Sequence, residues 1–247
     1  MSPDIVPVPV AAAEFWVFLA QSPLFWLALT LGAYLVADTL SALSGRNSLV
    51  NPVLIAIAII GAVLLATGTA YETFFAGAQF VHVLLGPATV ALAIPILRHR
   101  AQIRANLLPL AVALVVGAGV GIASAVGLAI AFGLDGALVA SLAPKSVTAP
   151  IAMGVARELG GIAELTAVLV IATGIIGAAL VTPVLNLLRV RDFRARGFAV
   201  GLAAHGIGTA RALQVSPVAG TFAGLAMALN GLVTALAAPW LVRWLAG

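Results

Sequence analysis

The sequence LAPKSVTAPIAM, residues 142 to 153, interrupts a strongly apolar region with two prolines, a lysine and two hydroxyl side chains. It contains Lys145, the single lysine of the 247-residue chain. Each proline removes a backbone donor and disrupts the preceding turn, so we expect a helix to break here and a new one to begin between Ser146 and Thr148. A helix N-terminus beside an ammonium group can bind a small anion. The alternative is a lysine that extends to the lipid headgroups or caps a helix C-terminus.

The composition is that of an integral membrane protein. Hydrophobic residues make up 63% of the chain and charged residues 8%, and the mean hydropathy is +1.19. A soluble domain carries about 25% charged residues. The sequence pI of 10.7 follows from arginines in short loops, which is typical of membrane topology and argues against nucleic-acid binding. The absence of cysteine excludes thiolate metal sites and disulfides.

The pattern of apolar runs predicts an all-α fold. We expect one polytopic membrane domain, residues 1–247, that begins with an extended N-terminal arm, residues 1–21. Six runs are long enough to cross a bilayer, which takes about 20 residues: 24–43, 50–69, 79–97, 106–132, 162–188 and 218–241. Two further segments, 137–160 and 197–215, are apolar but broken in the middle. Interrupted segments of this kind indicate a transporter's binding site.

The arginine-rich loops suggest the topology. The richest are RHRAQIR, from Arg98 to Arg104, and RVRDFRAR, from Arg189 to Arg196. Placing both in the cytoplasm leaves one crossing between Asp135 and Arg189, and the intact run 162–188 uses it. Segment 137–160 is then predicted to enter and return from outside. Segment 197–215 would enter from the cytoplasm, so that the two breaks approach each other from opposite faces.

Two other regions supply candidate binding residues. In GLAAHGIGTARA, residues 201 to 212, the glycines permit close backbone approach, and His205, Thr209 and Arg211 supply hydrogen-bond donors. A flexible interfacial loop is the alternative. Thr166 and Thr173 are seven residues apart on one face of run 162–188; they either line a substrate path or serve helix packing.

Other patterns carry less information. LLGPATVALAIPI, residues 84 to 96, and SLAPKSVTAPIAM, residues 141 to 153, align at an offset of 57 and suggest an internal repeat. Asp38 lies where it can pair with Arg46. The H-E-x-x-H, G-x-S-x-G and P-loop motifs are absent from the sequence, and the three histidines are widely scattered. We therefore expect no enzyme activity, no catalytic residues, no cofactor and no metal site.

The motifs PKSVTAPIA and RGFAVGLAAHGIGTA, together with LLGPATVALAIPI, closely resemble the LrgB/CidB family of bacterial membrane proteins. The resemblance covers the chain beyond its N-terminal arm. It implies one of two activities. Members are described as holin- and antiholin-like regulators of murein hydrolase export and lysis, acting with small LrgA/CidA-type membrane proteins. Related proteins are associated with pyruvate uptake and with acetate or lactate, and the plant chloroplast relative is a glycolate/glycerate translocator. Ala204 stands where many relatives carry a hydroxyl.

We therefore expect a carrier of small monocarboxylates in the bacterial inner membrane, with the holin-like role as the alternative. Lys145 would neutralise the carboxylate, and His205 would orient substrate or carry a proton. Hydrogen bonds and path lining would come from Ser146, Thr148, Thr166, Thr173, Thr209 and Arg211. The expected partners are the anion, membrane lipids, an LrgA/CidA-like protein and, by general frequency, a second copy of the chain.

Overall fold

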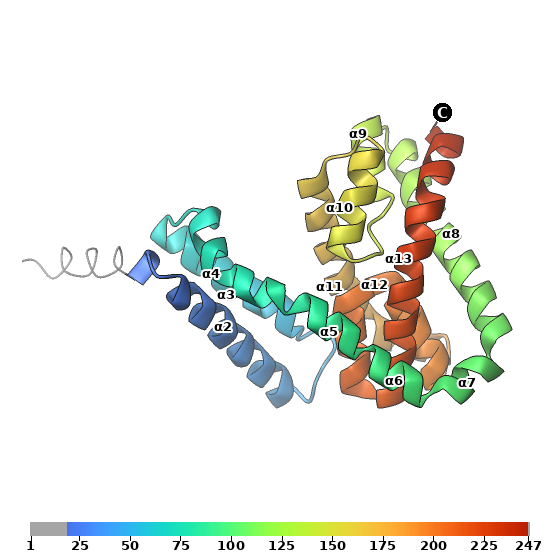
Figure 1. The fold of residues 1–247 in the computed structure, drawn as a ribbon, viewed down its shortest axis with the longest axis horizontal. Helices are drawn as coiled ribbons and strands as arrows, with labels where there is room; N and C mark the ends of the chain where they lie inside the picture. Colours follow the sequence, from blue (N-terminus) through green and yellow to red (C-terminus); the bar gives the residue numbers. More distant parts are fainter. Residues whose placement is uncertain (1–18, 247) are drawn as a thin grey trace, which may run out of the picture. The chain divides into compact units, whose positions relative to one another are not determined.

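The computed structural model describes residues 19–246, and every regular element in that range is an α-helix (Figure 1). This confirms the predicted all-α class. The predicted N-terminal arm lies outside the described residues except for its last three. The described residues form two compact units, divided between Ala91 and Leu92. The single membrane domain stays a prediction.

Unit 1 contains four labelled helices: α2 (Pro23–Leu43), α3 (Pro52–Thr67), α4 (Tyr71–Val83) and α5 (Leu85–Ala91). Helix α2 packs on α3 and α4. Trp26 is buried and meets Phe74 edge to face, with 6.0 Å between the ring centroids. Arg46 donates to the Asp38 carboxylate, so the predicted pair forms.

Unit 2 is built on three long helices: α8 (Leu107–Ala131), α11 (Ala163–Leu187) and α13 (Pro217–Ala246). Two short helices, α6 (Ala93–Arg98) and α7 (Arg100–Ala105), lead into α8. At 1.5 Å per residue, the 25 residues of α8 extend about 38 Å, which exceeds the roughly 30 Å of a bilayer's hydrocarbon core. Helix α13 packs against α8, α10 and α12.

The first hairpin, residues 136–158, consists of α9 (Gly136–Leu142), a non-helical tip and α10 (Ala149–Glu158). Helix α9 ends just before Pro144 and Lys145, and α10 begins after Thr148 with Pro150 in its first turn. The predicted break therefore occurs where the prolines place it. Figure 1 shows the two short helices side by side at one end of unit 2.

The second hairpin, residues 193–215, is α12 (Phe193–Val215), which folds back on itself. Its backbone leaves the helical region at Ala204 (φ −125°, ψ 15°) and His205 (φ 41°, ψ −130°). A methyl group at Gly208 would lie 2.9 Å from the carbonyl oxygen of Val200. A continuous helix would separate these residues by about 12 Å along its axis, so α12 is two half-helices joined at a sharp turn.

The predicted spans agree with the helices in most places. Within residues 19–246, five helical stretches are long and apolar enough to cross a membrane: Pro23–Leu43, Tyr71–Arg98, Leu107–Ala131, Ala163–Leu187 and Pro217–Leu245. The third predicted span, 79–97, is part of the longer stretch Tyr71–Arg98. The second, 50–69, corresponds to Pro52–Thr67, whose 16 residues fall short of the usual 20 or so. The chain is therefore a multi-pass membrane protein, although α3 is short.

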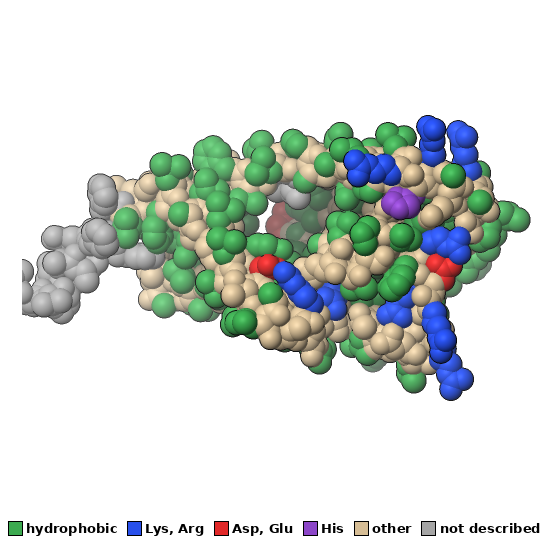
Figure 2. All heavy atoms as spheres, turned by 90° about the horizontal axis from the view of Figure 1, so that it is seen from below, with side chains coloured by type: hydrophobic (Ala, Val, Ile, Leu, Met, Phe, Trp, Pro, Cys, Tyr) green, Lys and Arg blue, Asp and Glu red, His purple; other side chains and the backbone are tan. Residues whose placement is uncertain are grey.

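Positive charge gathers at one end of unit 2. Gln102 and Arg191 line the same cavity, so the two predicted basic loops lie together. We call this the basic end; its arginines are Arg98, Arg100, Arg104, Arg189, Arg191, Arg194, Arg196 and Arg211. Figure 2 shows Lys and Arg side chains gathered over this face. Val139 and Val242 pack together at the opposite end, which carries Asp135. The positive-inside rule predicts that the basic end faces the cytoplasm.

Candidate functional site

The tips of the two hairpins are joined by one side chain of α13. The Asn230 Nδ2 donates to the Leu202 carbonyl at 2.9 Å and to the Ser146 carbonyl at 3.3 Å. Thr234, one turn later on α13, donates its hydroxyl to the Asn230 Oδ1 at 3.3 Å. Asn230 and Thr234 are buried. Carbonyls freed by a helix break need a partner in a membrane, and the Asn230 amide supplies one for both breaks.

The tips meet near the middle of the long helices. A methyl group at Gly121 of α8 would lie 3.9 Å from the Ser146 Oγ, and one at Gly174 of α11 would lie 2.9 Å from the His205 Nε2. Gly121, Gly174 and Asn230 all lie close to the centres of their helices. The two hairpins therefore enter from opposite ends and stop at the same depth.

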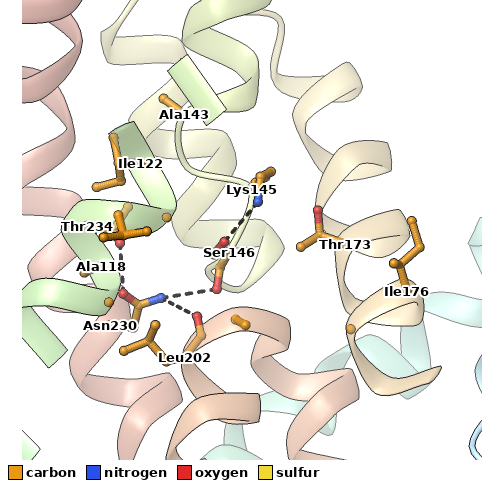
Figure 3. Close-up of a pocket in the computed structure, with 15 residues that line it drawn as sticks. Ala118, Ile122, Ala143, Lys145, Ser146, Thr173, Ile176, Leu202, Asn230 and Thr234 are labelled. Carbon is orange, nitrogen blue, oxygen red and sulfur yellow. Dashed lines mark hydrogen bonds between the residues drawn. The ribbon is translucent and has the colours of Figure 1, made fainter. Parts of the chain in front are cut away.

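A cavity of about 440 Å³ lies where they meet. Figure 3 shows Lys145 and Ser146 at the centre of the lining, with Thr173 of α11 to the right and Asn230 to the lower left. Its polar lining residues are Lys145, Ser146, Thr173, Asn230 and Thr234; apolar residues, among them Ile122, Ile176 and Leu202, form the remainder. A mostly apolar pocket with a few convergent polar groups is typical of a small-molecule site.

Lys145 gives this cavity its charge. The ammonium group is half-buried and lies 3.5 Å from the Ser146 Oγ. Within residues 19–246, no carboxylate lines the cavity or forms an ion pair with Lys145. A half-buried charge is costly without a counterion. An ammonium with nearby hydroxyl donors can bind a carboxylate through short, charge-assisted hydrogen bonds.

Three of the predicted site residues hold the hairpins in place. The Thr166 hydroxyl donates to the Ser141 carbonyl at 3.1 Å and to the Ile162 carbonyl at 3.0 Å, which fastens the first hairpin to α11. The buried His205 ring donates from Nε2 to the Val170 carbonyl at 2.9 Å. The Thr209 hydroxyl donates to the His205 carbonyl at 2.7 Å. These three side chains lie outside the cavity lining.

Two other predicted residues also lie outside the lining. Thr148 is half-buried and precedes α10 as its N-cap, without a side-chain capping bond. Arg211 lies at the basic end, where it lines a small crevice with Phe193 and Arg196 and approaches the Gln214 side chain at 3.4 Å. The structure therefore brings Lys145, Ser146 and Thr173 together in the cavity lining. The other candidates lie outside it, with Arg211 at the basic end.

Sequence reasoning missed Asn230, Thr234 and Leu202. Asn230 is the one asparagine of the 30-residue apolar helix α13, and Thr234 follows it at i+4. A polar amide inside a membrane helix is itself a signal of function or of helix contact. Leu202 gave no such signal, because a leucine before a break is indistinguishable from any other apolar residue. No group of His, Asp and Glu side chains in the described residues is arranged to hold a metal ion.

Comparisons with known proteins point to one family. The model of the LrgB-like family matches residues 30–244. The protein YwbG of Bacillus subtilis is 34% identical over 195 residues, which cover 79% of this chain and 87% of YwbG. A Haemophilus influenzae protein is 31% identical over 219 residues, with 89% of this chain and 90% of that protein covered.

One relative whose name describes a function is the holin-like protein CidB of Staphylococcus aureus. It is 30% identical over 196 residues, which cover 79% of this chain and 86% of CidB. No solved structure matches the chain. The matched range includes both hairpins, α8, α11 and Asn230.

Proposed function

The chain belongs to the LrgB-like family, and we propose that this multi-pass membrane protein is a carrier of small monocarboxylates. The observation that carries the proposal is Lys145, a half-buried ammonium without a carboxylate partner among the described residues, in a cavity between two broken helices. Carriers commonly bind substrate where discontinuous helices meet near the bilayer midplane.

In this proposal the substrate carboxylate accepts hydrogen bonds from Lys145 and Ser146. Thr173 faces the substrate from α11, and Asn230 maintains the distance between the two tips. Alternating access then follows from movement of the hairpins against α8, α11 and α13. Pyruvate, lactate, acetate and glycolate or glycerate are the substrate class, in keeping with the resemblance to LrgB/CidB relatives. The carrier would work in the bacterial inner membrane.

The second candidate is a holin-like regulator of murein hydrolase export and lysis. The names of the staphylococcal relatives support it directly, and they favour this role over transport. In that case the same hairpins would gate an oligomeric pore or contact an LrgA/CidA-like partner. A homodimer and contacts of the basic end with anionic lipids are compatible with either candidate.

Uptake into liposomes tests the first candidate. The purified protein is expected to give saturable pyruvate uptake, and Lys145→Gln is expected to reduce it at least tenfold, because a hydrogen bond to a charged group contributes about 1.5–3 kcal/mol. Arg157→Gln is the matched control: it also removes one positive charge, but Arg157 is exposed at the end of α10 and outside the cavity.

The same liposomes separate the two candidates. Release of a large trapped dye, unaffected by Lys145→Gln, would support a pore and contradict the carrier. If neither flux nor leak appears until an LrgA/CidA-like protein is added, the chain is a partner subunit. A pH gradient applied to the same preparation measures coupling to protons.

A further inference from the structure

A second cavity leads from the basic end toward the Lys145 cavity. Its volume is about 460 Å³. It lies between the first half of α8 and the first half of α12, and its lining includes Asn106, Ala113, Ala195 and Phe198. Asn106 precedes the first residue of α8, so the cavity extends from the loop region to the middle of the helix.

The two cavities share two lining residues, Gly117 and Leu202. The Leu202 side chain lies directly over Gly117: a methyl group there would be 2.9 Å from the Leu202 Cδ2. The Leu202 carbonyl is held by Asn230, so the side chain has a fixed anchor. The Leu202 side chain therefore lies at the boundary between the two cavities.

A third cavity, of about 370 Å³, adjoins the second cavity at the surface of the basic end. It shares Asp192 and Arg194 with the second cavity and adds the exposed Arg191. Asp192 and Arg194 form an ion pair at 2.6 Å. The hydrogen bonds from Arg194 hold the pKa of Asp192 below its ordinary range, so the pair stays charged at neutral pH. Arg191 then leaves the opening with net positive charge, which attracts anions.

On the side toward Asp135, the Lys145 cavity is closed by many packed side chains. A packed cluster of buried apolar residues from α8, both helices of the first hairpin and α13 lies between the cavity and the Asp135 end; its members are Ile122, Val126, Ala129, Val139, Ala143, Val155, Ala238 and Val242. Opening that side requires the cluster to separate. Opening the basic side requires Leu202 to move.

We propose that the three cavities form the access route of a small anion from the basic end to Lys145, and that Leu202, seated on Gly117, is the residue that closes it and limits what passes. The identity of the anion rests on the proposed function. The route itself rests on the lining residues that neighbouring cavities share. It rests also on the contrast between the two sides of the Lys145 cavity, where Leu202 lies on the basic side and a packed apolar cluster on the Asp135 side.

The cysteine-free chain allows a test that needs no transport. Ser146→Cys places a thiol in the Lys145 cavity, and Ala113→Cys places one in the second cavity. A small, membrane-impermeant, anionic methanethiosulfonate is applied to either face of sealed vesicles, with Gln102→Cys marking the basic face. We expect the Ser146→Cys thiol to react from the basic face, and Leu202→Ala to accelerate that reaction at least tenfold.

Control variants show whether the change in labelling rate is specific to Leu202. Leu128→Ala removes an equally large but exposed side chain from α8 and should leave the rate unchanged. The thiol of Ala113→Cys should react equally fast with or without Leu202→Ala, and Leu202→Val should give an intermediate rate if the alanine variant is unstable. Faster reaction of the Ser146→Cys thiol from the Asp135 face than from the basic face, or a basic-face rate that is insensitive to Leu202, would overturn the route. Pyruvate uptake can fail while this labelling succeeds, so the two proposals are tested separately.

Discussion

His205 shows how one residue makes a sharp turn inside a membrane helix. Its φ of 41° is unusual for a residue other than glycine. The ring donates to the Val170 carbonyl and the backbone carbonyl accepts from Thr209. Gly174 leaves room for the ring, because a methyl group there would be 2.7 Å from the His205 Cε1. The histidine therefore fixes the second tip to α11.

We expect two variants at position 205 to differ in stability. His205→Ala loses the ring's hydrogen bond and keeps the positive φ, whereas His205→Gly loses the same bond but relieves about 1 kcal/mol of backbone strain. The thermal midpoint in detergent should fall from the natural protein to His205→Gly and further to His205→Ala. Ala203→Gly is the control, because Ala203 has helical dihedrals and glycine should destabilise it. An alanine variant as stable as the glycine variant would contradict the strained turn.

At the scale of elements, the second hairpin depends on a seam of small residues. Gly197 and Gly201 are one turn apart on α12 and face the backbone of Ala219 and Ala223 on α13. A methyl group at either glycine would overlap the facing carbonyl oxygen. Small residues at such spacing allow membrane helices to approach closely.

Gly201→Ala should therefore destabilise the protein. Because α12 must move away from α13 to accept the methyl group, the expected cost is about 1–3 kcal/mol, visible as a lower thermal midpoint. Gly127→Ala is the matched control, since a methyl group there meets no atom within 4 Å and alanine favours the helix. Equal thermal midpoints for Gly201→Ala and Gly127→Ala would show that α12 and α13 leave room for a methyl group at Gly201, which would contradict the close packing.

The sequence predicted the elements better than their contacts. Pro144 and Pro150 locate the first break because proline acts on its own backbone, and the glycines around His205 signal the second. The junction at Asn230 joins groups 84 and 28 residues away, which no local pattern encodes. The prediction that His205 orients substrate or carries a proton does not reveal its bond to Val170, because a histidine in an apolar run looks the same in sequence whether it binds a ligand or a backbone carbonyl.

At the scale of the whole molecule, unit 2 combines charge asymmetry with two opposed hairpins. The basic end carries most of its arginines, and Lys145 lies about half a helix length away, in the middle of the unit. With the Debye length near 10 Å at 0.1 M salt, the arginines attract an anion to the opening but do not hold it. In the proposed carrier, Lys145 is the charge that would bind it.

Equilibrium binding measures whether Lys145 holds a small anion between the two hairpin tips. Calorimetric titration of the purified protein in detergent with pyruvate should give saturable binding for the natural protein and for Arg157→Gln. Lys145→Gln should bind at least tenfold more weakly, without a lower thermal midpoint, because among the described residues the ammonium makes one long hydrogen bond, 3.5 Å to the Ser146 Oγ. Binding to Lys145→Gln that is as tight as binding to the natural protein would contradict an anion site between the two hairpin tips.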